Sequence, residues 1–92
     1  MNKSQLIDSL SEETLFTKKD VARLLDSLAR TVQRALKNGD KVQWASFGTW
    51  SVSRRPARKG INPATKQRID LPAVNVPRFK PGKALREVVR SI

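Results

Sequence analysis

The chain has 92 residues, and its 19 Lys and Arg against 8 Asp and Glu give a formal net charge of +11. It contains no cysteine and no histidine, which excludes disulfides and thiolate or imidazole metal ligands. A chain this short forms at most one domain, 1–92, and the small core of such a domain favours oligomerisation. No apolar run is suited to a membrane span or a signal peptide, so a soluble, cytosolic protein is expected.

Residues 1–40 are predicted to form a helical region with nearly balanced charge, seven basic against six acidic side chains. A first helix is expected from Lys3 to about Glu13. Asn2 is suited to cap its start, and Gln5, three residues later, completes a pattern like a capping box.

The second predicted helix is longer and more strongly amphipathic. Thr17 is expected to cap its start, and Gly39 to follow its end, where a positive φ is needed. This face is broader than the first helix can cover, so a second copy of the chain is expected to supply the rest, which makes 1–40 the predicted dimerisation region. The face consists of apolar residues at helical spacing over five turns: Val21, Leu24, Leu25, Leu28, Val32, Ala35 and Leu36.

From residue 41 the sequence period changes to two, which indicates antiparallel strands. Residues 41–53 and 74–80 are expected to form one sheet. Pro72 cannot donate to a ladder, so it is expected to mark an edge or a bulge that bends the arm. A short last helix is predicted over residues 83–91, and its first amides could face a phosphate. The third strand carries four apolar residues: Ile69, Leu71, Val74 and Val76.

Residues 54–73 are predicted to form a projecting β-ribbon arm whose turn lies at Asn62-Pro63-Ala64-Thr65, with Gly60 also suited to a turn. Residues 41–92 hold twelve basic and two acidic side chains, and the stretch 54–68 holds six basic and none acidic. Such a ribbon suits a polyanion such as duplex DNA, because neutralised phosphates release counterions. A disordered basic loop is the alternative. The expected contacts are Arg54, Arg55, Arg58, Lys59, Lys66 and Arg68.

Two apolar residues stand at the predicted tip of the arm. Pro63 could insert between base pairs, at a cost of a few kcal/mol per unstacked step, although most Asn-Pro pairs are simply turns. Ile61, beside it, has no core to enter, and could join the wedge or pack against the wall of the minor groove.

Trp44 and Trp50 permit two interpretations. They could stack on bases, but both lie on the apolar face of the predicted strands, which favours core packing. The sequence contains no paired-carboxylate, metal-ligand or phosphate-loop pattern. We therefore expect neither an enzyme, nor a cofactor, nor a metal site.

Two segments, SFGTWSVSRRPARKGINPAT and NVPRFKPGKALREVV, resemble the bacterial HU/IHF family of histone-like DNA-bending proteins, and the likeness extends over essentially the whole chain. The resemblance implies an α+β fold: an intertwined homodimer with a base of two N-terminal helices under an antiparallel β-saddle, two extended β-ribbon arms and a short C-terminal helix. It implies that the arms embrace the minor groove, with Pro63 intercalating. The residues that it carries over are Arg55, Arg58, Asn62 and Pro63 for DNA contact, and Lys3, Lys83 and Arg86 for phosphate contact.

Three residues depart from the family pattern. Ser46 stands where Gly is usual, so the tight connection there is expected to be shaped differently. Trp50 replaces the usual Phe, which implies a larger core residue. Ile61 replaces a common arm-tip Arg, which removes one charge from the minor groove.

The expected function is that of an architectural protein, a homodimer that binds double-stranded DNA with little sequence specificity, bends or kinks it, and compacts the bacterial chromosome in the cytoplasmic nucleoid. One alternative is a site-selective, IHF-like subunit that pairs with a paralogue and reads DNA shape. The other is a basic protein associated with RNA or the ribosome.

Overall fold

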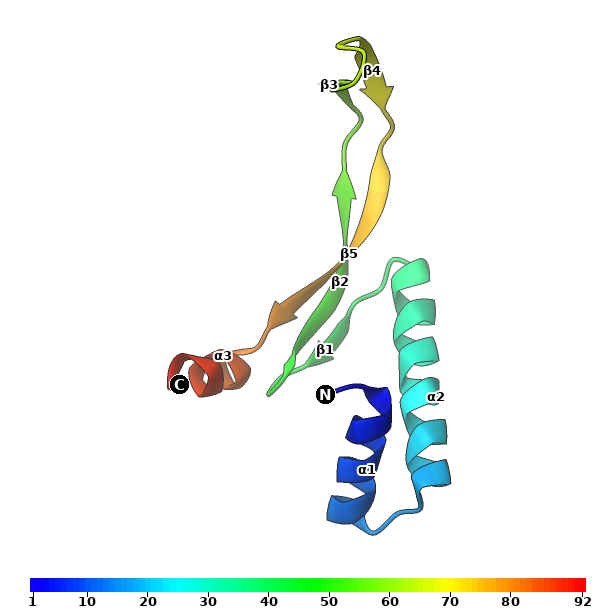
Figure 1. Cartoon of the computed structure of the whole chain (residues 1–92), viewed down its shortest axis with the longest axis vertical. Helices are drawn as coiled ribbons and strands as arrows, with labels where there is room; N and C mark the ends of the chain where they lie inside the picture. The colour runs from blue at the N-terminus through cyan, green and yellow to red at the C-terminus, as the bar shows by residue number, and fades with distance from the viewer. The chain divides into compact units, whose positions relative to one another are not determined.

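The computed structural model describes all of residues 1–92 and contains two compact units, Met1–Arg34 and Ala35–Ile92. One antiparallel sheet has the strand order β1-β2-β5, and β3 pairs with β4 in a second sheet. The predicted order of two helices, antiparallel strands and a last helix is confirmed. The elements (Figure 1) are α1 (Lys3–Thr14), α2 (Lys18–Lys37), β1 (Val42–Trp44), β2 (Gly48–Arg55), β3 (Arg58–Ile61), β4 (Arg68–Leu71), β5 (Val74–Pro81) and α3 (Lys83–Arg90).

Both predicted helix caps are present. The N–H of Gln5 donates to Oδ1 of Asn2 at 2.9 Å, and the N–H of Asn2 donates to Oε1 of Gln5 at 3.0 Å, which completes the capping box of α1. At the start of α2, the N–H of Asp20 donates to Oγ1 of Thr17 at 3.1 Å. Each cap satisfies backbone donors that the helix leaves unpaired, a contribution of about 1 kcal/mol.

The helix pair α1–α2 has a small core of its own. The two helices lie side by side (Figure 1) and are joined by ion pairs between Lys3 and Asp26 and between Lys18 and Asp8. Only Val21, 4% exposed, is a fully buried apolar residue, whereas Leu24 on the same helix is 63% exposed. The apolar face of α2 is therefore incompletely covered within one chain, as its width predicted.

The tight connection between β1 and β2 is a turn in which the N–H of Phe47 donates to the carbonyl oxygen of Trp44 at 2.8 Å. Ser46 lies inside this turn without a positive φ, because the positive-φ residues of the chain are Leu15, Gly39 and Lys66. Serine therefore forms the connection without the conformational freedom of glycine.

An aromatic cluster covers one region of the three-stranded sheet. The ring centroids of Trp50 and Phe79, which are register partners on β2 and β5, lie 4.8 Å apart, and Phe47 lies 5.0 Å from Trp44. These separations are typical of favourable aromatic pairs, so Trp50 is accommodated by packing on its neighbours. Trp44 nevertheless remains 49% exposed in the single chain.

Gly48 is held at a close approach of two strands. A Cβ built there would lie 2.5 Å from ring carbons of Phe79 and 2.7 Å from the backbone oxygen of Lys80. We expect Gly48→Ala to destabilise the fold by about 1–3 kcal/mol, because the contact forces overpacking. A urea titration measures the change, and Ser46→Ala in the neighbouring exposed turn is the control, expected to leave the midpoint unchanged. Equal midpoints for Gly48→Ala and wild type would contradict the close approach.

The long ribbon is interrupted on both strands. β2 pairs with β5 as far as Arg55↔Val74, and β3 pairs with β4 from Arg58↔Leu71 onward. Between them lie the dipeptides 56–57 and 72–73, each beginning with a proline that has no N–H for a ladder. The predicted third strand is divided into β4 and β5 at Pro72, where the sequence predicted an edge or a bulge.

Element ends differ slightly from the predicted ones. The three-stranded sheet extends to residue 55 on β2 and to residue 81 on β5, beyond the expected limits of 53 and 80. α3 ends at Arg90, and Ser91 is its C-cap rather than its last residue.

Candidate nucleic-acid interface

The arm, residues 54–73, carries a two-stranded hairpin at its far end. β3 and β4 are in register from Arg58↔Leu71 to Ile61↔Arg68. The N–H of Asn62 then donates to the carbonyl oxygen of Gln67 at 2.8 Å, which closes the ladder at the tip. The predicted ribbon is confirmed, and the alternative of a loop without structure does not describe this segment (Figure 1).

The tip is a structured turn organised by Asn62. Its Oδ1 accepts from the N–H of Ala64 at 2.9 Å, and its carbonyl oxygen accepts from the N–H of Lys66 at 2.7 Å. Lys66 takes the left-handed conformation with φ +58°, whereas Gly60, expected to help the turn, lies within β3 opposite Ile69. That part of the turn prediction was wrong. The sequence does not indicate this conformation, because lysine rarely adopts a positive φ.

Both predicted wedge residues are accessible. Pro63 is exposed at the first position after Asn62, and Ile61 is 67% exposed at the end of β3. Neither side chain is held in an apolar core. The hydrogen bonds of Asn62 organise the backbone between them, so the two apolar groups flank a hydrogen-bonded turn.

The six predicted cations of the arm are all exposed, and none takes part in an ion pair within 4 Å. The one acid of the arm, Asp70, lies opposite Lys59 in the register. Unpaired cations at this density repel one another, and a polyanion relieves that repulsion. The six are Arg54, Arg55, Arg58, Lys59, Lys66 and Arg68.

The three predicted phosphate contacts of the body lie on different elements. Lys83 and Arg86 are on α3, where Lys83 Nζ lies 3.8 Å from Oε1 of Glu87. Lys3 begins α1 and forms its ion pair with Asp26 of α2. Lys3 is thus engaged in the free protein, so a phosphate bound at Lys3, as predicted, would compete with the Asp26 carboxylate.

The Lys3 ammonium lowers the pKa of Asp26 below its ordinary value of 3.8, through a hydrogen bond and its charge, and Arg30 adds a smaller effect. A depressed folded pKa stabilises the fold above the unfolded value, and this contribution is lost as pH falls through the folded pKa. We expect Lys3→Gln to raise the Asp26 pKa, measured by an NMR titration of the carboxyl carbon. Lys18→Gln, which frees Asp8 instead, is the control. An unchanged Asp26 pKa in Lys3→Gln would show that the pair does not form in solution.

The structure has no group of three or more His, Cys, Asp or Glu residues that could hold a metal ion. None of the three helices combines the length and hydropathy that crossing a bilayer requires. A helix pair, a small sheet and a projecting cationic ribbon with an apolar tip together define a small nucleic-acid-binding protein.

Comparison with known proteins specifies the family. The family model described as "Bacterial DNA-binding protein" matches residues 1–90, so the chain belongs to this family, whose members are DNA-binding architectural proteins and not enzymes. The chain is 49% identical over 89 residues to DNA-binding protein HU 1 of Bacillus subtilis, with 97% of both chains covered. It is 46% identical to DNA-binding protein HU of Thermus thermophilus, covering 98% of this chain and 93% of the other.

Solved structures agree with the sequence relatives. An Anabaena HU–DNA cocrystal structure superposes with a TM-score of 0.91 at 39% identity, covering 97% of each chain. HU from Thermotoga maritima gives a TM-score of 0.71 at 37% identity, covering 97% of this chain and 98% of the other. The predicted relationship to the HU/IHF family is confirmed.

Proposed function

We propose that this protein binds double-stranded DNA through the minor groove with little sequence specificity, bends it, and thereby compacts the chromosome. The observation that carries the proposal is the β-ribbon arm, with six unpaired cations along it and Pro63 exposed on a hydrogen-bonded turn. The DNA-bound Anabaena relative, at TM-score 0.91, supports the same reading.

The arm has the dimensions and charge for a groove. From residue 54 to the tip, nine residues in extended conformation reach about 30 Å. Its cations bind phosphates mainly by releasing counterions, an attraction without sequence information. Because contacts to phosphates carry no sequence information, we expect the arm to bind with low sequence specificity.

Bending is assigned to the tip. Wedging of apolar side chains between base pairs is an established property of minor-groove architectural proteins, including this family. Here Pro63 supplies the wedge, and Ile61 adds apolar contact where the family commonly has an arginine. The unstacking cost, a few kcal/mol per step, is offset when the bent duplex meets more protein.

The homodimer belongs to this proposal. One chain exposes 8176 Å², whereas a folded monomer of 10.4 kDa exposes roughly 5,400 Å². Part of this excess belongs to the projecting arm, and the rest is surface that a second chain would bury. Half-exposed apolar residues in both units, such as Leu24 at 63%, Trp44 at 49% and Phe79 at 40%, would supply the buried surface. A heterodimer with a paralogue would bury the same faces.

The partners are thus double-stranded DNA and a second copy of the chain, and no small-molecule substrate or cofactor is proposed. The place of action follows from the partner, namely the bacterial nucleoid in the cytoplasm.

The test is end-to-end energy transfer on a labelled DNA duplex, with an RNA duplex of the same sequence beside it. We expect the DNA ends to approach and the RNA to stay straight, because the wide, shallow minor groove of A-form RNA does not fit the arm. Equal binding to both would support the RNA-associated alternative. Unlabelled bulk DNA should compete as well as a defined site, and a large preference for one site would support the IHF-like alternative.

A further inference from the structure

The outer face of α2 carries a second set of cations that the arm does not account for. Lys19, Arg23, Arg30 and Arg34 lie within about 40° of one line along the helix, at 3.6 residues per turn. They span about 22 Å at 1.5 Å per residue. We call this set the α2 basic row.

The row lies opposite the apolar face of the same helix. The line through Val21, Leu25 and Val32 is rotated by about 180° from it. Whatever covers the apolar face in a dimer, the basic row therefore points away from that contact. All four of its side chains are exposed.

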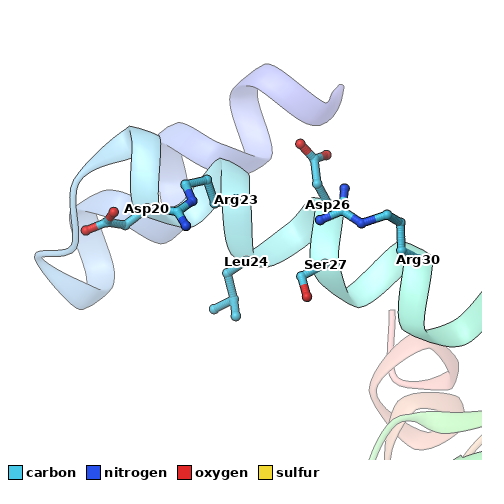
Figure 2. A pocket seen from close by; sticks show the side chains of 6 residues that line it. All are labelled: Asp20, Arg23, Leu24, Asp26, Ser27 and Arg30. Atoms are coloured by element: carbon cyan, nitrogen blue, oxygen red, sulfur yellow. The ribbon is translucent and has the colours of Figure 1, made fainter.

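The row is also electrostatically available. No ion pair within 4 Å involves any of its members, and Arg34 donates only to the hydroxyl of Thr31, at 3.3 Å. Two acids, Asp20 and Asp26, flank it, and Figure 2 shows Arg23 directed toward Asp20 and Arg30 toward Asp26.

The flanking acids do not neutralise the face. Asp26 is already paired with Lys3, so with Lys3 five cations stand against two acids. Three of the four row members are arginines, the side chain suited to bidentate phosphate contact.

We propose that the α2 basic row binds a second DNA duplex, so that a protein already holding one duplex by its arms bridges it to another. The proposal rests on the proposed function of the arm. A polyanion matches the charge of the row, and a helix face is nearly straight, which suits an unbent duplex better than one kinked at an arm tip. Compaction then arises from cross-linking as well as from bending.

The experiment uses a biotinylated duplex on beads, saturated with the full-length protein and washed, to which a fluorescent second duplex is added. We expect the double variant Arg30→Gln and Arg34→Gln to reduce capture about tenfold or more at 0.1 M salt, because each lost phosphate contact removes about 0.9 from the salt slope. Bending of a single labelled duplex should stay as in wild type. Bending that fails in wild type would instead refute the proposed function of the arm.

The matched control is the double variant Lys41→Gln and Arg90→Gln, which has the same net charge of +9 and should retain capture. The charge-preserving pair Arg30→Lys and Arg34→Lys should also retain most of it. The proposal is overturned if wild type captures no second duplex, or if both glutamine doubles lose capture equally. It is also overturned if Arg30→Gln and Arg34→Gln shorten the stretch of the first duplex that is protected while capture is unchanged.

Discussion

Neutralising the arm hairpin will remove most of the affinity for DNA and most of its salt dependence. In the quadruple variant Arg58→Gln, Lys59→Gln, Lys66→Gln and Arg68→Gln, each homodimer loses eight exposed cations. At about 0.9 per neutralised phosphate, the slope of log K against log salt should fall by about 7. A loss of several decades in affinity at moderate salt follows, which fluorescence anisotropy measures across a salt series.

The control has the same net charge with the changes away from the arm, at Lys18, Lys37, Lys41 and Arg90, all to Gln. Its slope should remain close to that of wild type, because only cations that contact phosphates release counterions. If the two quadruple variants weaken binding equally, affinity depends on the net charge of the protein, and the arm is not the part of the surface that contacts the phosphates.

Pro63→Ala will separate binding from bending. Alanine keeps the turn, because the hydrogen bonds at the tip involve Asn62 and its neighbours rather than the proline ring. It is too small to fill the space between unstacked base pairs, so the kink should be lost while the cations still hold the duplex. Energy transfer between labelled duplex ends should then approach that of free DNA, with an affinity loss smaller than for the quadruple arm variant.

Pro63→Leu is the matched variant, since a larger apolar side chain can still wedge, and it should retain most of the bend. The double variant Ile61→Ala and Pro63→Ala should remove any bend that Pro63→Ala leaves, because Ile61 is the other exposed apolar residue beside the turn. A Pro63→Ala protein that bends DNA as strongly as wild type would assign the kink to another part of the protein.

Local signals in the sequence predicted the elements well. Asn2 and Gln5 formed the expected capping box, and Thr17 the expected cap, because each motif involves residues three apart. The arm was equally readable, since a run of cations flanked by alternating strands has few other structures. Asn62 and Pro63, which the sequence predicted at the tip of the arm, lie in its turn.

Features set by longer-range geometry were not predictable in this way. The left-handed Lys66 follows from closing the turn on Gln67, which no preference of lysine signals. The need for glycine at position 48 depends on Phe79, which is distant in the sequence. The α2 basic row was not apparent from composition, because the charge of that segment is nearly balanced. Its cations come to lie on one face of the chain when the helix forms.

Strand pairing in the arm is interrupted at the same level on both strands, so the arm is two successive ladders and not one continuous ladder. Pro56 and Pro72 begin facing two-residue gaps where neither strand contributes a ladder hydrogen bond. A change of angle at this point would therefore break no ladder hydrogen bond of β2–β5 or of β3–β4. Such a change of angle would let one arm meet narrow and wide grooves alike, so tolerance of many DNA sequences would follow from the backbone as well as from the charge of the arm.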